Sequence, residues 1–183
     1  MLVDALYLNR VVREISTHFS AVLNQKLPAA DLSVLLECMA MDAQVKVGQG
    51  NVQVLFIYDK QLTSFSHVIP SDLKVALNDV AFQSNVGEFQ LNSYEPQDMA
   101  DRETFFLESL KVIADAKEVK HLIVVPEEEE VIEQISSILE KVDGKDYVGV
   151  LGMKQPDKTV PYHWDTLGYA VMHALGIRSD QLQ

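Results

Sequence analysis

The stretch that most constrains the fold runs from residue 119 to residue 152 and has the pattern strand, helix, strand. Residues 121–125 (HLIVV) form a short apolar run rich in β-branched side chains, which is typical of a strand buried on both faces. Apolar residues then recur at helical spacing over 131–142, and Gly144 is suited to end that helix. A second apolar run over 147–151 predicts another strand. Because two strands joined by a helix pair in parallel, this stretch predicts an α/β fold.

The remaining residues predict further elements on both sides of this unit. Apolar stripes at helical spacing predict two early helices, over 4–26 and, capped by Asp31, over 31–43. Later helices are expected shortly after Pro70, from Asp98 or Asp101 to Ala116, and from Trp164 to Leu175. Alternating or apolar runs predict three more strands, over 52–58, 62–69 and 87–94.

The strands over 52–58 and 62–69 are separated only by residues 59–61, which favours a tight turn and an antiparallel hairpin. The sequence therefore predicts an α/β protein with a mixed sheet of about five strands, in which an antiparallel hairpin joins parallel central strands. Helices flank the sheet, and an N-terminal helical pair is attached to it. The chain of 183 residues favours a single domain, with the helical pair in residues 1–47 and the α/β core in residues 51–183.

Composition excludes several classes of function. The formal net charge is −12, and the lysines and arginines are scattered, so nucleic-acid binding is not expected. No apolar run is long enough to cross a bilayer, and the first residues lack the basic lead of a secretory signal. Cys38 is the only cysteine, which fits a reducing compartment. We therefore expect a soluble, acidic, cytoplasmic protein with no membrane partner.

The best candidate for a ligand site is the segment 152–165, because it follows a predicted parallel strand at the end where open α/β sheets bind ligands. This segment and the helix after it carry side chains able to position a small polar ligand: Lys154, Tyr162, His163, Tyr169 and His173. A structural role is the alternative, in which Asp165 caps the helix and His173 favours the negative end of its dipole. No nucleophile elbow, phosphate-binding loop or zinc-protease motif occurs in the chain.

The order of the expected elements over residues 52–176 resembles the ribonuclease H-like fold: a hairpin, a third strand, and then alternating helices and strands. Residues 163–170 (HWDTLGYA) also resemble the final helix of phage-type nuclease domains. In the ribonuclease H-like fold, acidic residues from the first strand, the end of the fourth strand and the last helix gather two divalent ions. The resemblance thus implies Asp59, Glu127 and Asp165 as catalytic metal ligands that hold Mg²⁺ or Mn²⁺ for phosphodiester cleavage.

Two classes of function follow from the sequence. We favour a non-enzymatic protein that binds a protein partner or a small ligand and needs no cofactor, because the residues do not form a complete catalytic set. The alternative is the metal-dependent nuclease or phosphodiesterase, which requires its three carboxylates within a few ångströms of one another. A homodimer is also expected, since closed two-fold dimers are the commonest oligomers.

Overall fold

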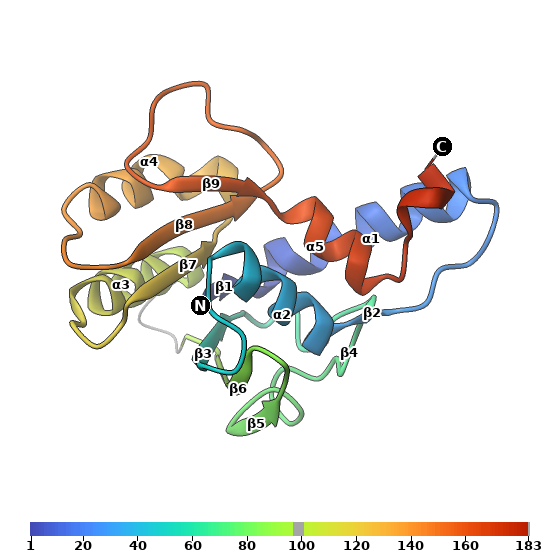
Figure 1. Ribbon diagram of the computed structural model, residues 1–183, viewed down its shortest axis with the longest axis horizontal. Helices are drawn as coiled ribbons and strands as arrows, with labels where there is room; N and C mark the ends of the chain where they lie inside the picture. Colours follow the sequence, from blue (N-terminus) through green and yellow to red (C-terminus); the bar gives the residue numbers. More distant parts are fainter. Residues whose placement is uncertain (97–100, 183) are drawn as a thin grey trace.

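The computed structural model describes residues 1–96 and 101–182, and over these residues the chain forms a seven-stranded sheet, a two-stranded sheet and five α-helices (Figure 1). The strands of the large sheet, in chain order, are β1 (Leu2–Asp4), β3 (Gly50–Ile57), β5 (Val80–Gln83), β6 (Gly87–Tyr94), β7 (His121–Val125), β8 (Tyr147–Gly152) and β9 (His163–Thr166). The small sheet pairs β2 (Ala30–Asp31) with β4 (Val68–Ile69). The helices are α1 (Ala5–Val22), α2 (Leu32–Asp42), α3 (Arg102–Asp115), α4 (Glu128–Leu139) and α5 (Leu167–Ala174), and a short 3₁₀ helix covers Ser179–Leu182.

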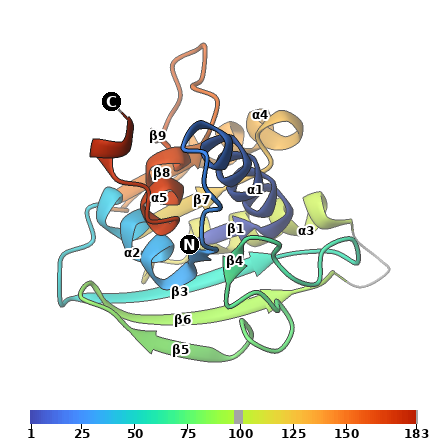
Figure 2. The ribbon, with the colours of Figure 1, turned by 90° about the vertical axis from the view of Figure 1, so that its right-hand side faces the viewer.

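The order of strands in the large sheet is β5-β6-β3-β1-β7-β8-β9. Every neighbouring pair is parallel except β5 and β6, and the arrowheads of β3 and β6 point opposite to that of β5 in Figure 2. The chain runs outward from β1 through β3 to β6, then returns across β1 and runs outward again from β7. This is the strand order of doubly wound α/β sheets, and it reverses direction between β1 and β7.

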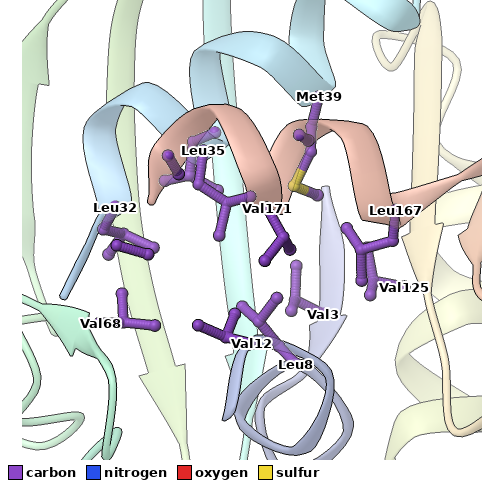
Figure 3. Packing of buried hydrophobic residues seen from close by; sticks show 14 of the residues in the cluster. Val3, Leu8, Val12, Leu32, Leu35, Met39, Val68, Val125, Leu167 and Val171 are labelled. Atoms are coloured by element: carbon purple, nitrogen blue, oxygen red, sulfur yellow. The ribbon is translucent and has the colours of Figure 1, made fainter. Parts of the chain in front are cut away.

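Helices cover both faces of the sheet. Residues of α1, α2 and α5 pack with one set of strand side chains, and residues of α3 and α4 pack with the other set. Figure 3 shows the first of these cores, where Val3 from β1 meets Leu8, Met39 and Val171 from the three helices. Its neighbour Leu2 lies in the second core, and Leu2 and Val3 are each 0% exposed. A strand of three residues can sit at the centre of the sheet because its two faces are fully buried.

Several predicted elements are confirmed. The unit over residues 119–152 forms β7, α4 and β8, and the two strands pair in parallel with His121 opposite Tyr147. Asp31 caps α2, since its carboxylate accepts hydrogen bonds from the amides of Ser33 and Val34. Asp101 caps α3 in the same way, whereas the alternative start at Asp98 lies outside the described residues.

The expected antiparallel hairpin over residues 52–69 is wrong. β3 lies between β1 and β6 and pairs in parallel with both, so neither of its edges is available to residues 62–69. Only Val68 and Ile69 of that stretch form a strand, and this strand pairs with β2 in the small sheet. The alternation in this stretch instead reflects a covering loop, in which Phe65 is 4% exposed and packs on Phe56 of β3.

Three further expectations are corrected. The helix expected shortly after Pro70 is absent, and residues 73–79 form turns and a bend instead. The large sheet has seven strands rather than about five, and the first residues form its central strand, so the N-terminal helices are connections within the sheet and not an attached pair. At the other end, residues 163–166 form β9 instead of the start of a helix, and Thr166 rather than Asp165 caps α5. With no hairpin and with β1 at its centre, the sheet does not support the resemblance to the ribonuclease H-like fold.

Candidate functional site

Five charged side chains meet at the carboxyl ends of β1, β3 and β7, and we call them the switch-point cluster. Three are acidic: Asp4 ends β1, Asp59 follows β3, and Glu127 follows β7. Two are basic: Arg10 comes from the second turn of α1, and Arg102 is the first residue of α3. Because the strand order reverses between β1 and β7, this is the part of a doubly wound sheet where a crevice for ligands is expected.

Asp4 is the most deeply buried member, at 2% exposure. Its Oδ1 accepts a hydrogen bond from the Tyr7 amide at 3.0 Å and so caps α1, and its Oδ2 accepts one from Arg102 Nη1. Burial raises the pKa of the Asp4 carboxyl above its ordinary value of 3.8, although the Tyr7 hydrogen bond and the Arg102 charge oppose that rise. In Asp4, burial thus raises the pKa of the carboxyl even though a cation is bound to it.

Arg102 links two strands of the sheet. Its side chain is 13% exposed, and besides Asp4 it approaches Asp59, with Nε 3.3 Å from Oδ2. That second contact is an ion pair that is not aligned as a hydrogen bond. One guanidinium therefore pairs with the carboxylates at the ends of β1 and β3 and holds the start of α3 against them.

Arg10 and Glu127 form the outer part of the cluster. Arg10 Nη2 donates to Glu127 Oε1 at 2.6 Å, and the Arg10 side chain is 42% exposed while that of Glu127 is 9% exposed. The Arg10 guanidinium also lies over the ring of Tyr7, 5.3 Å from its centroid. The hydroxyl of Tyr7 in turn accepts a hydrogen bond at 3.1 Å from the amide of Met153, just after β8. Arg10 is therefore the basic group that the cluster presents to solvent.

The structure brings together two of the three predicted metal ligands. Asp59 and Glu127 lie on either side of β1, but Asp165 lies in β9, four strands away from β3, which is about 19 Å across the sheet at the usual spacing. Asp4 stands where a third carboxylate was expected. Among the residues that the structure describes, no group of three His, Cys, Asp or Glu side chains could hold a metal ion.

A family model described as a family of unknown function (DUF6621) matches residues 1–182. The chain belongs to this family. Neither a curated protein nor a solved structure gave a match. The DUF6621 match spans the sequence from β1 to α5 and so includes every member of the switch-point cluster. In the described part of the chain, no helix is long and apolar enough to cross a membrane.

In this DUF6621 chain, Asp165 belongs to a different group of side chains, beside β8 and β9. There the ring of Tyr147 lies between His121 and His163, with centroid distances of 6.2 and 5.1 Å and nearly parallel planes. Burial raises the pKa of Asp42 above its ordinary value, and the negative charge of Asp165 adds to that rise. Asp165 therefore faces another carboxylate and an aromatic stack rather than the switch-point cluster.

The other predicted ligand-binding residues are spread over two faces of the DUF6621 fold. Tyr162 packs in the core beneath α3 and α4, whereas Tyr169 and His173 are exposed on α5, across the sheet. Lys154 is exposed in the connection between β8 and β9. The sheet lies between Tyr162 and the α5 residues, so these side chains cannot surround one small ligand. Binding by any one of them stays a prediction.

Sequence reasoning missed Asp4, Arg10 and Arg102. A signal for Asp4 was present in the sequence. Asp4 is suited to cap a helix and directly follows two apolar residues, and this pattern also occurs where a short strand leads into a helix. Three residues, however, are too few for a periodic pattern. Nothing in the local sequence distinguishes Arg10 or Arg102 from an exposed arginine, because their partners are 117 and 98 residues away.

Proposed function

We propose that this protein binds a small polar ligand at the switch-point cluster without catalysing a reaction on it. The observation that carries the proposal is the meeting of five charged side chains, from three elements and two connections, at the point where the strand order reverses. Charged groups are costly to desolvate, so their concentration at one edge of the sheet is better explained by a binding site than by stability alone.

The outer groups of the cluster, Arg10, Glu127 and Asp59, indicate the class of ligand. Arg10 presents a planar guanidinium with several N–H donors, of which one is bonded to Glu127, so it suits a phosphate or carboxylate group. Glu127 and Asp59 are acceptors and suit hydroxyl or amine donors on the same ligand. Glu127 is also the N-cap residue of α4 but makes no side-chain bond to its amides, so its carboxylate serves Arg10 and not the helix start. A small molecule with one anionic group and several hydroxyls fits this donor and acceptor set.

The state of Asp4 supports binding rather than catalysis. A general acid or base must reach the substrate, and Asp4 is 2% exposed with one oxygen on the Tyr7 amide and the other on Arg102. Arg102 is likewise held between two carboxylates. The inner pair, Asp4 and Arg102, thus holds the strands and α3 in place. The outer pair, Arg10 and Glu127, is left to contact the ligand.

Thermal unfolding with adenosine monophosphate, adenosine or inorganic phosphate tests the proposal. Adenosine monophosphate carries both an anion and hydroxyls, and a ligand at a hundred times its dissociation constant adds ~2.7 kcal/mol to the free energy of unfolding. We expect the midpoint to rise in the parent protein and to stay unchanged in Arg10→Gln. The matched control is Arg178→Gln, which removes an exposed arginine paired with Asp180 near the C-terminus and should keep the full rise.

An unchanged midpoint with all three compounds would contradict the proposed ligand class. A rise that persists in Arg10→Gln would place binding elsewhere on the protein. A rise with inorganic phosphate alone would support the anion site at Arg10 but contradict the proposed hydroxyl contacts to Glu127 and Asp59.

A metal-dependent phosphodiesterase is the second candidate, and one observation favours it. Asp4, Asp59 and Glu127 reach the same edge of the sheet, and Arg102 pairs with two of them. Displacement of Arg102 would leave carboxylate oxygens of the kind that Mg²⁺ and Mn²⁺ prefer. The test is the rise in midpoint caused by Mn²⁺ in the parent, in Asp59→Asn and in the control Asp165→Asn. This candidate requires a rise that only Asp59→Asn loses, and equal rises in all three proteins would exclude it.

A further inference from the structure

A groove of about 930 Å³ runs between the first turns of α2 and the edge strand β5, and it shares no residue with the switch-point cluster. Its floor and walls include the apolar side chains of Leu32, Ile69 and Phe82. Ile69 is 56% exposed, which is high for a large apolar side chain beside a concave surface. A groove of this size and lining is in the range of sites that bind ligands or peptide side chains.

The groove reaches the edge of β5 and not only one of its faces. Successive residues of a strand point to opposite faces of the sheet, yet Val80, Ala81, Phe82 and Gln83 all line the groove. In the described sheet, β5 is the terminal strand and pairs with β6 on its other side. Its outer edge therefore presents backbone N–H and C=O groups that a further strand can use.

The charge of the lining favours an occupant of opposite charge. Among the described residues that line the groove, the charged ones are Asp31 and Glu37, both acidic. Hydrogen bonds from the Ser33 hydroxyl and from backbone amides hold the pKa of Asp31 below its ordinary value, so this carboxylate stays ionised at neutral pH. A second copy of the chain is a poor occupant, because each copy has a formal net charge of −12.

We propose that this groove binds an extended peptide segment of a partner protein in which Lys or Arg lies next to an apolar residue. The segment adds to the edge of β5 as a further strand, and its backbone hydrogen bonds supply the alignment. Its apolar side chain enters the groove toward Leu32 and Phe82. Its cation lies beside Asp31 and Glu37, which gives the groove its preference among extended peptides.

Selection from a phage-displayed library of random octapeptides tests this inference with the full chain as bait. We expect the enriched peptides to place Lys or Arg beside an apolar residue. Fluorescence anisotropy of one labelled enriched peptide then measures affinity, which should fall about tenfold in Glu37→Lys because like charges repel. The matched control is Glu133→Lys, which reverses an exposed charge on α4, across the sheet, and should leave the affinity unchanged. Thermal unfolding checks that both variants fold.

Hydrogen exchange locates the bound peptide. Addition of the enriched peptide should slow exchange of amides within residues 80–83, as expected when a strand pairs with β5. The proposal is overturned if no peptide is enriched, if acidic peptides are enriched, or if Glu37→Lys binds as well as the parent. It is also overturned if the slowed amides lie outside β5, or if the chain sediments as a dimer whose amides in residues 80–83 are already protected without peptide.

Discussion

At the scale of the residue, Asp4 and Asp31 show the same local structure in different surroundings. Both are N-cap residues with extended backbone, at φ −74° and ψ 111° for Asp4 and φ −76° and ψ 115° for Asp31. Asp31 is exposed and serves α2, whereas Asp4 is buried and also pairs with Arg102. The pair therefore separates the contribution of a helix cap from that of a buried ion pair.

We predict that Asp4→Ala destabilises the protein more than Asp31→Ala does. Loss of the Asp31 cap costs about 1 kcal/mol, which is usual for an N-cap aspartate. Loss of Asp4 removes an equivalent cap and leaves Arg102 with Asp59 alone, which adds about 2 kcal/mol because a buried charge loses its closest partner. Urea unfolding of the two variants measures both values. Equal losses would show that the Asp4–Arg102 pair contributes nothing beyond the cap.

The same two residues predict opposite pH dependences. The folded pKa of Asp31 lies below its ordinary value of 3.8, so its contribution to stability is present above pH 3.8 and is lost as the pH falls through the folded pKa. Burial raises the folded pKa of Asp4 above 3.8, so its contribution is complete below pH 3.8 and is lost as the pH rises through the folded pKa. The measured quantity is the unfolding free energy of the parent minus that of the variant. This difference should increase with pH for Asp31→Asn and decrease with pH for Asp4→Asn. Slopes of the same sign for both variants would contradict the burial of Asp4.

At the scale of the element, two paired glycines determine how closely β3 and β6 can start. Gly50 and Gly87 lie opposite each other at the beginning of the two strands. Gly87 has a φ of +147°, and a Cβ at this position would lie 2.0 Å from the carbonyl oxygen of Gly50. A side chain there meets backbone that cannot move without disturbing the strand pair. The close parallel pairing of β3 with β6 thus depends on a residue without a Cβ.

We predict that Gly87→Ala costs about 3 kcal/mol or more, because it combines an unfavourable φ with a backbone clash. The matched control is Gly144→Ala, which also replaces a glycine of positive φ, at +71°, but has no atom within 4 Å of the added Cβ. That control should lose only about 1 kcal/mol. Chemical unfolding of the two variants measures the difference. If both lose the same amount, the approach of Gly50 and Gly87 is looser than the structure indicates.

At the scale of the whole molecule, the position of β1 connects fold and site. This strand puts Asp4 at the centre of the sheet, and its neighbours β3 and β7 bring Asp59 and Glu127 to the same edge from 55 and 123 residues further along the chain. α1 and α3 then supply Arg10 and Arg102 from opposite faces of the sheet. The switch-point cluster therefore forms only when β1, β3 and β7 are neighbours in the sheet, so its ion pairs depend on the correct order of strands.

The elements with a strong local pattern could be predicted from the sequence, and most of them were. The apolar runs of β7 and β8, the stripe of α4 and the capping aspartates of α2 and α3 each depend on neighbours in the chain, so short-range physics decides them. The prediction failed where a pattern had two interpretations. Residues 62–69 alternate as a strand does, but β3 is already paired on both sides and cannot accept them. Its partners are residues 2–4 and 87–94, which are distant in the sequence.

The sequence by itself determined the α/β class, the parallel unit of β7 and β8, and the acidic character that disfavours nucleic acid. It also identified Asp59 and Glu127 as residues that follow strands. Only the tertiary structure decided the full order of strands. That order places Asp4, and not Asp165, with Asp59 and Glu127, and it sets the ion pairs of Arg10 and Arg102. The physical reason is that helix caps and apolar periodicity act within a few residues, whereas strand order is set by burying both faces of one sheet at once.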